Sequence, residues 1–180
     1  SEMCIRDRLV MDDGWFGEKY PRNNGSTSLG DWTVCREKLP QGIGGLVDAA
    51  KKYGVKFGIW IEPEMVSEKS NLFKEHPDYA FVIPGRKPVM GRSQLNLDFS
   101  RKEVVNCIFN QLTAVLDKID VDYIKMDMNR SILNVYSMTE GIQNNGTILY
   151  KYVLGVYDFM ERLQARYPKT VSYTHLTLPT

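Results

Sequence analysis

One stretch of sequence decides the fold: Ser100 to Asp127, which reads SRKEVVNCIFNQLTAVLDKIDVDYIKMD. Its first part carries apolar residues at the spacing of an amphipathic helix, and Ser100 with Glu103 forms a capping-box pattern that predicts where this helix begins. Its second part, Val121 to Met126, predicts a strand that ends at Asp127. The apolar positions of the helix are Val104, Val105, Ile108, Phe109, Leu112, Val115, Leu116 and Ile119.

The alternation of strand, loop and helix continues on both sides of this stretch. Two further strands are predicted at 9–11 and 55–60, and each runs into acidic residues, Asp12-Asp13 after the first and Glu62-Pro63-Glu64 after the second. This order is typical of parallel βαβ units. The other predicted elements are a long loop at 22–30 and helices at 46–53, 70–75 and 148–163.

Two parallel α/β architectures fit such a pattern. A doubly wound sheet binds its ligands through tight glycine-rich turns, but the sequence contains no G-x-G-x-x-G motif and no P-loop. A (β/α)₈ barrel places catalytic residues on long loops at the carboxyl ends of its strands, as here. A complete barrel needs about 250 residues. The sequence therefore predicts a partial (β/α)₈ barrel, with about three of its eight βα units.

Composition excludes several classes of protein. The 180 residues are 43% hydrophobic and 25% charged, as in ordinary globular proteins, and the net charge of +1 argues against a nucleic-acid-binding surface. No apolar run approaches the roughly 20 residues that cross a bilayer, and no secretory signal pattern is present. The three scattered cysteines predict neither a zinc site nor a disulfide scaffold. We therefore expect a cytoplasmic protein without a membrane or nucleic-acid partner.

The residues that could bind a substrate or take part in a reaction lie at the strand ends. Asp12 and Asp13 precede Gly14-Trp15, and paired carboxylates beside an indole suit the hydroxyls and the C–H face of a sugar, although acidic pairs also occur in plain turns. Lys125 and Asp127 lie on the same side of their strand because side chains alternate. They form either a simple ion pair or a nucleophile kept ionised by a neighbouring cation.

Other polar and aromatic residues near the strand ends are ambiguous on their own. Trp60 could belong to the core, Glu62 and Glu64 to a solvated loop edge, and Arg92 to the surface. Asn129 directly follows the Lys125–Asp127 pair and could add a hydrogen-bond donor. Only their joint placement at successive strand ends indicates a site.

These motifs together resemble those of glycoside hydrolase family 36, which consists mainly of α-galactosidases. The matching segments follow one another in the same order from about Leu9 to Pro168. They are Asp12–Gly17 (DDGWFG), Ser28–Trp32 (SLGDW), Lys56–Met65 (KFGIWIEPEM), Gly91–Gln94 (GRSQ) and Tyr123–Arg130 (YIKMDMNR). Met126 departs from the pattern, because many members have Trp there.

The resemblance implies a fold, a reaction and a set of roles. The catalytic domain would be a (β/α)₈ barrel that hydrolyses terminal α-galactosides of the melibiose and raffinose type by a retaining double displacement, without a cofactor or a metal. Asp127 would be the nucleophile. Asp12 and Asp13 would hold galactose hydroxyls, and Trp60 would line the sugar pocket. Hydrogen bonds to the sugar would come from Arg92, Lys125 and Asn129.

Retaining chemistry needs a second carboxylate about 5–5.5 Å from the nucleophile. In this family the acid/base residue follows a later strand, beyond Pro168, so we expect the chain to be a fragment that lacks it, taken from a parent that could be a homo-oligomer. Residues 1–8 and 171–180 do not resemble the family and look like translated adapter sequence. We therefore assign the barrel to residues 9–170 and expect poorly packed, non-native tails.

Three other interpretations remain open at this level. A magnesium-dependent barrel enzyme could use the strand-end carboxylates as oxygen ligands and Lys125 as a base. A non-catalytic sugar-binding module would keep the acidic pair and Trp60 but would have no need of Lys125 and Asp127. The fragment could also be inactive, since an open barrel exposes strand edges. The candidate magnesium ligands are Asp12, Asp13, Glu62, Glu64, Asp98 and Asp127.

Overall fold

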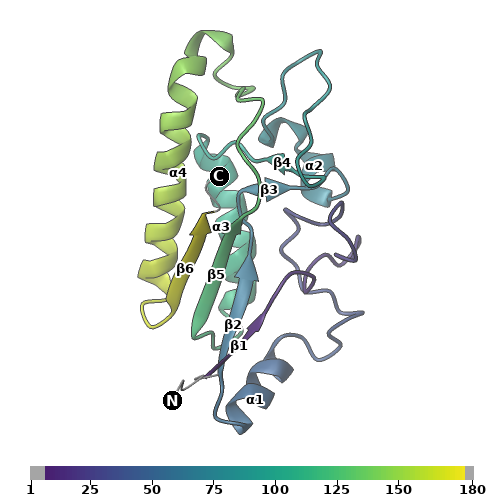
Figure 1. Ribbon diagram of the computed structural model, residues 1–180, viewed down its shortest axis with the longest axis vertical. Coiled ribbons are helices and arrows are strands. Elements are labelled where there is room, and N and C mark those ends of the chain that lie inside the picture. Colours follow the sequence, from purple (N-terminus) through teal and green to yellow (C-terminus); the bar gives the residue numbers. More distant parts are fainter. Residues whose placement is uncertain (1–6, 177–180) are drawn as a thin grey trace, which may run out of the picture.

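The computed structural model describes residues 7–176, and its centre is a four-stranded parallel sheet (Figure 1). The strands lie side by side in the order β1-β2-β5-β6, and every neighbouring pair is parallel. Their carboxyl ends therefore meet at one edge of the molecule. The strands are β1 (Arg8–Met11), β2 (Lys56–Ile61), β5 (Tyr123–Met128) and β6 (Val171–Leu176).

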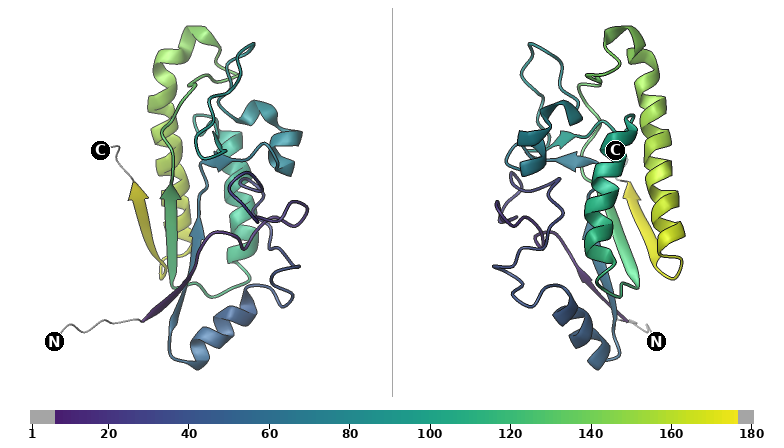
Figure 2. Two further views of the ribbon diagram at one scale, coloured as in Figure 1. Left: turned by 45° about the vertical axis from the view of Figure 1, so that its right-hand side comes forward. Right: turned by 180° about the vertical axis from the view of Figure 1, so that it is seen from behind.

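Helices connect these strands, and the two longest, α3 (Lys102–Leu116) and α4 (Asn145–Arg166), cover the same face of the sheet (Figure 2, right). They pack directly on each other. A small antiparallel two-stranded sheet of β3 (Met65–Val66) and β4 (Leu95–Asn96) lies near the carboxyl ends of the strands. The shorter helices are α1 (Gly44–Lys52), α2 (Asn71–Glu75), η1 (Pro77–Tyr79) and η2 (Ile142–Asn144).

Side chains along β5 alternate between two faces of the sheet, one that packs in the core and one that carries the candidate site. Ile124 and Met126 are buried and share a crevice with Met160 and Leu163 of α4. The side chains between them, including Lys125, therefore point to the opposite face, which α3 and α4 leave uncovered. α4 packs closely on the segment that precedes α3, where a Cβ on Gly155 would come within 1.9 Å of the Phe99 carbonyl oxygen, so only glycine fits there.

The predicted elements are confirmed, with shifted ends. Helix 46–53 begins earlier and helix 148–163 extends at both ends, because helix ends depend on capping contacts that periodicity does not show. The prediction of a capping box is wrong, because the N-cap residue of α3 is Arg101, whose side chain makes no capping hydrogen bond. The Ser100 hydroxyl donates instead to Asp98, and Glu103 accepts from the Arg101 guanidinium. Ser100 and Glu103 therefore bond to neighbouring charged side chains and do not form the capping box.

The expectation that residues 171–180 do not continue the βα pattern is wrong for Val171–Leu176. These residues form β6, which pairs with β5 along its whole length, from Val171 opposite Tyr123 to Leu176 opposite Met128. The alternating β-branched and aromatic residues suit a strand, and α4 returns the chain to the sheet edge. Arg8 likewise pairs in β1, so the sheet exceeds the predicted limits 9–170. Residues 1–6 and 177–180 of the predicted tails lie outside the described residues.

The architecture is thus an α/β fold with a parallel sheet, as the alternation predicts, and the sheet remains open within residues 7–176. The described strands form no closed barrel. In the same part of the chain, every helix is too short or too polar to cross a lipid bilayer.

Candidate functional site

Asp127 lies in β5 near its carboxyl end and is the centre of a cluster of direct contacts. The indole N–H of Trp60 donates to Asp127 Oδ2 at 2.8 Å, and Lys125 Nζ lies 3.5 Å from the same oxygen. The other oxygen, Oδ1, is buried and has no hydrogen-bond partner in the described structure. The carboxylate is therefore held through Oδ2, while Oδ1 is buried without a partner among the described residues.

Lys125 joins this cluster to the end of β1. Its ammonium group donates to Asp12 Oδ2 at 3.2 Å and lies between Asp12 and Asp127. Burial opposes its charge, but the hydrogen bond with Asp12 and the negative charge of Asp127 outweigh burial and raise the pKa of Lys125. The predicted placement of Lys125 and Asp127 on one side of the strand is confirmed, and the lysine is held in its charged form.

Asp13 is fixed by a residue that the sequence did not single out, Arg22. The buried Arg22 guanidinium meets both Asp13 oxygens, with Nε 3.0 Å from Oδ1 and Nη2 3.1 Å from Oδ2. It also donates to the Thr27 carbonyl at 2.8 Å. A fork of this kind fixes the orientation of a carboxylate. Asp12 and Asp13 thus have separate cationic partners, and both side chains stay partly exposed, at 65% and 41%.

The tryptophans lie beneath the site. The sequence-based view that Trp15 offers an open face to a sugar is wrong, because Trp15 is completely buried and its indole N–H donates to the Trp60 carbonyl. It packs with Phe16 and Trp32, whose rings also contact Trp60. The loop that follows β1 supplies most of this aromatic cluster. Burying the Trp15 ring in the cluster is more favourable than leaving one of its faces exposed to solvent. Trp60 is 2% exposed and reaches Asp127 through its N–H.

A second pair of predicted residues, Arg92 and Asn129, meets beyond the end of β5. Arg92 Nη1 donates to Asn129 Oδ1 at 2.9 Å. Glu62 lies beside them and accepts from the Asn129 backbone N–H at 2.9 Å and from Gln94 Nε2 at 3.3 Å. Burial raises the pKa of Glu62 to about 7, although the Asn129 hydrogen bonds and the charges of Arg22 and Arg92 oppose the shift. The view of Glu62 as a solvated edge is therefore wrong.

Glu64 and Asp98 are also buried, but they serve other contacts. Glu64 accepts from the Tyr152 hydroxyl of α4, and Asp98 accepts from Ser100. Burial raises the pKa of both carboxyl groups. The solvated-edge expectation is wrong for Glu64 as well. Among the side chains that the structure describes, no three of His, Cys, Asp or Glu lie close enough to hold a metal ion.

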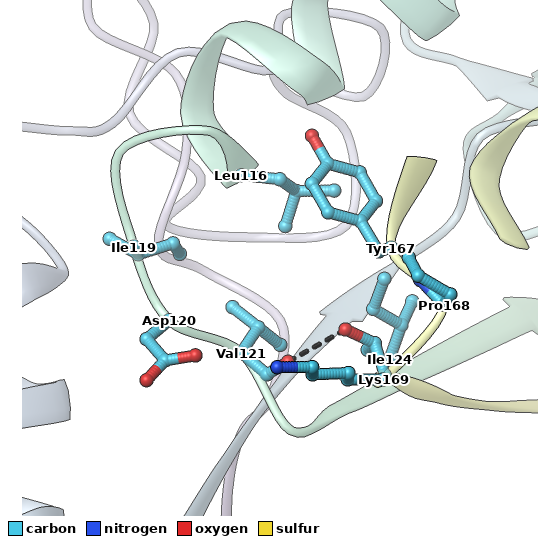
Figure 3. A pocket seen from close by; sticks show the side chains of 9 residues that line it. Leu116, Ile119, Asp120, Val121, Ile124, Tyr167, Pro168 and Lys169 are labelled. Carbon is cyan, nitrogen blue, oxygen red and sulfur yellow. Dashed lines mark hydrogen bonds between the residues drawn. The ribbon is translucent and has the colours of Figure 1, made fainter. Parts of the chain in front are cut away.

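The opposite end of the strands has a different character (Figure 3). A crevice of about 250 Å³ lies there, lined mainly by apolar side chains such as Leu116, Ile119 and Ile124. Its carboxylate, Asp120, is paired with Lys51 at 2.7 Å, and the Thr170 hydroxyl donates to the Val121 carbonyl. Among the described residues, this end has no carboxylate held by a lysine and a tryptophan as Asp127 is. In (β/α)₈ barrels, likewise, the carboxyl ends of the strands carry the catalytic residues and the amino ends serve stability.

Sequence reasoning missed Arg22 and Gln94 as supporting residues. Arg22 opens a loop rich in Asn, Gly and Ser, and a lone arginine in such a loop gives no sign that it is buried against Asp13. Gln94 belongs to the segment GRSQ, in which the family resemblance implies a role for Arg92 alone. A buried partner is invisible until the loops are placed in space.

Comparison with known proteins identifies the family of this chain. Residues 2–174 match the melibiase family. The chain is 54% identical over 162 residues to the bifunctional α-galactosidase/sucrose kinase AgaSK of Mediterraneibacter gnavus, and 47% identical over 162 residues to α-galactosidase Mel36A of Lactobacillus acidophilus. These alignments cover 90% of this chain but only 16% and 22% of the relatives.

A solved structure shares the fold. A variant of the family 36 α-galactosidase AgaA from Geobacillus stearothermophilus, in complex with raffinose, superposes with a TM-score of 0.89 at 38% identity. The match covers 93% of this chain and 23% of that one, so the chain spans about a fifth of the length of these relatives. The matching family, the identities and the shared structure lead to one conclusion: this chain belongs to the melibiase family, with the α-galactosidases of glycoside hydrolase family 36.

Proposed function

We propose that these residues form part of the catalytic domain of a retaining α-galactosidase that hydrolyses terminal α-galactosides of the melibiose and raffinose type. The observation that carries the proposal is the state of Asp127: Trp60 and Lys125 hold one oxygen, and Oδ1 is left without a partner among the described residues. The contacts of Trp60 and Lys125 fix the orientation of the Asp127 carboxylate, and a nucleophile needs such positioning. The raffinose complex of a relative supports the substrate class.

The reaction proceeds in two displacements. The Asp127 carboxylate attacks the anomeric carbon of galactose, the bond to the leaving oxygen breaks, and that oxygen receives a proton from a second carboxyl group. Water then attacks the galactosyl–Asp127 ester, and the same second carboxyl group removes the water's proton. Two inversions give net retention. We propose that this second group belongs to a later part of the complete protein, since the chain spans only about a fifth of its relatives.

The remaining predicted residues bind the sugar in this proposal. Asp12 and Asp13 are partly exposed and accept hydrogen bonds from galactose hydroxyls, while Lys125 donates. Arg92 and Asn129 supply donors beyond the end of β5. In addition, we propose that the sheet is a sector of a (β/α)₈ barrel, with α3 and α4 outside (Figure 2). Lys125 and Asp127 would then face the interior, because they alternate along β5 with the buried Ile124 and Met126.

Two measurements on the complete protein test this function. An aryl α-galactoside should be hydrolysed with α-galactose as the first product by NMR, because double displacement retains the configuration. Release of β-galactose first would contradict the double displacement, and absence of hydrolysis would contradict the function. Activity should also survive a chelator. Loss that magnesium restores would instead favour the metal-dependent alternative.

A further inference from the structure

Glu62 is a buried carboxylate that connects two separate parts of the site. It lies in the turn after β2 and is 1% exposed. One of its oxygens accepts from the Asn129 backbone N–H, at 2.9 Å, in the segment after β5. The other accepts from Gln94 Nε2, at 3.3 Å, in the loop before β4. A single side chain therefore ties together two segments that are distant in sequence.

The loop that carries Arg92 needs such support. Arg92 and Ser93 have φ angles of 52° and 60°, in the left-handed region that residues with a Cβ rarely adopt. Contacts hold the loop in this conformation: the Arg130 guanidinium donates to the carbonyls of Gln94 and Val89. The hydrogen bond from Arg92 to Asn129 then closes a ring of contacts that passes through Glu62 and Gln94.

We propose that Glu62 is a positioning residue, which holds the Arg92 loop through Gln94 and holds Asn129 through its backbone, so that both side chains reach the sugar together. This inference rests on the proposed function and assigns Glu62 no contact with the substrate. Glu62 acts only through its partners, and its effect should therefore depend on Arg92 being present.

Glu64 offers a matched control. It lies two residues away in the same acidic turn and is equally buried, at 3% exposure, but its side chain bonds to Tyr152 of α4 instead of to a sugar-binding residue. A general disturbance of this turn would affect variants at both positions. A positioning role predicts an effect on sugar binding at Glu62 alone.

The first experiment compares variants of the complete protein on an aryl α-galactoside. Glu62→Ala should lower kcat/KM by about 10- to 100-fold, chiefly by raising KM, as is usual when a supporting residue is lost. Glu62→Gln keeps the shape and an acceptor for the Asn129 N–H, and should recover kcat/KM to within about threefold. Glu64→Ala, the matched truncation, should leave KM within about twofold of the wild-type value. A folded Glu62→Ala variant with wild-type KM would overturn the proposal.

The second experiment measures coupling between Glu62 and Arg92. In an Arg92→Ala background, Glu62→Ala should cost less than about threefold, because the loop no longer carries its binding group. An undiminished cost would mean that Glu62 is only structural. If Glu62→Ala does not fold, Gln94→Leu replaces it in the same cycle with the same criterion. Dissociation constants for 1-deoxygalactonojirimycin give a parallel readout, so failure of hydrolysis in the wild type would contradict the proposed function without deciding the role of Glu62.

Discussion

The two ends of the central strands differ in chemistry although the same strands form both. At the carboxyl ends, charged side chains contact one another in a connected cluster that includes Asp12, Lys125 and Asp127. At the amino ends, apolar residues such as Leu116 and Ile124 line a crevice, and the pair of Lys51 and Asp120 is exposed. A parallel sheet separates chemistry from stability in this way, because every strand delivers its following loop to the same edge.

Two carboxyl groups show the contrast. Glu62, near the carboxyl ends, is buried, and its pKa is raised to about 7. Asp117, after α3 near the amino end of β5, accepts hydrogen bonds from Arg166 and Tyr167, and these lower its pKa to about 2. Glu62 lies in a low-dielectric environment, which disfavours its charged form, whereas Asp117 is exposed to solvent and paired with the cation of Arg166. In the complete protein, substitutions at the carboxyl ends should therefore impair hydrolysis, whereas substitutions at the amino ends should not.

Asp127→Ala should have the largest effect. Hydrolysis should fall by at least about 10³-fold, even for substrates with activated leaving groups, because a good leaving group replaces acid assistance but not the nucleophile. Steady-state kinetics with a dinitrophenyl galactoside measures the loss. Asp120→Ala at the opposite end is the control and should remain near wild type.

Lys125→Ala should be nearly as severe. It removes a sugar-binding donor and the positive charge 3.5 Å from Asp127, and we expect kcat/KM to fall by about 10²- to 10³-fold. Asp12 would also lose its hydrogen-bond partner. A variant that keeps a tenth of wild-type kcat/KM would show that the ion pair is merely structural.

Asp13→Asn should act on binding. Its carboxylate is oriented by Arg22, and the amide keeps the shape but loses the charge of this fork. We expect affinity for galactose to weaken by about tenfold, with measurable hydrolysis remaining. Calorimetric titration with galactose checks the first point. Unchanged affinity would remove Asp13 from the sugar site.

Glu62→Gln should change pH dependence more than activity. The folded-state pKa of Glu62 is raised from 4.5 to about 7, so its contribution to stability is full below 4.5 and is lost as pH rises through 7. At about 1.4 kcal/mol per pKa unit, the loss approaches about 3 kcal/mol. The apparent Tm of Glu62→Gln relative to wild type should therefore rise between pH 4.5 and 8. A constant difference across this range would contradict the shifted pKa.

Ile124→Ala should leave hydrolysis unchanged to within about twofold and lower stability instead. Ile124 is 1% exposed and faces the crevice and the helices, and removal of such a side chain typically costs about 2–5 kcal/mol. Denaturant unfolding measures the loss. A large drop in kcat at full folding would show that the two ends are not independent.

The sequence predicts more of the strand ends than of the loops. Alternation along β5 is local information, so it correctly placed Lys125 and Asp127 on one side of the strand. The burial of Trp15 and Glu62 depends on loops that pack over them from elsewhere in the chain, which no local pattern reveals. β6 shows the same limit, since its pairing with β5 decides its structure and no local pattern reveals that pairing.

The most direct test of the central claim, that Asp127 is the nucleophile, is azide rescue of Asp127→Ala. The variant would be supplied with an activated aryl α-galactoside and sodium azide, and the product identified by NMR. Azide in the space left by the carboxylate should attack the anomeric carbon, displace the aryl oxide and give a β-galactosyl azide, the inverted product of a single displacement. Near-normal turnover of the variant with no galactosyl azide would contradict the account, because another group would then be the nucleophile.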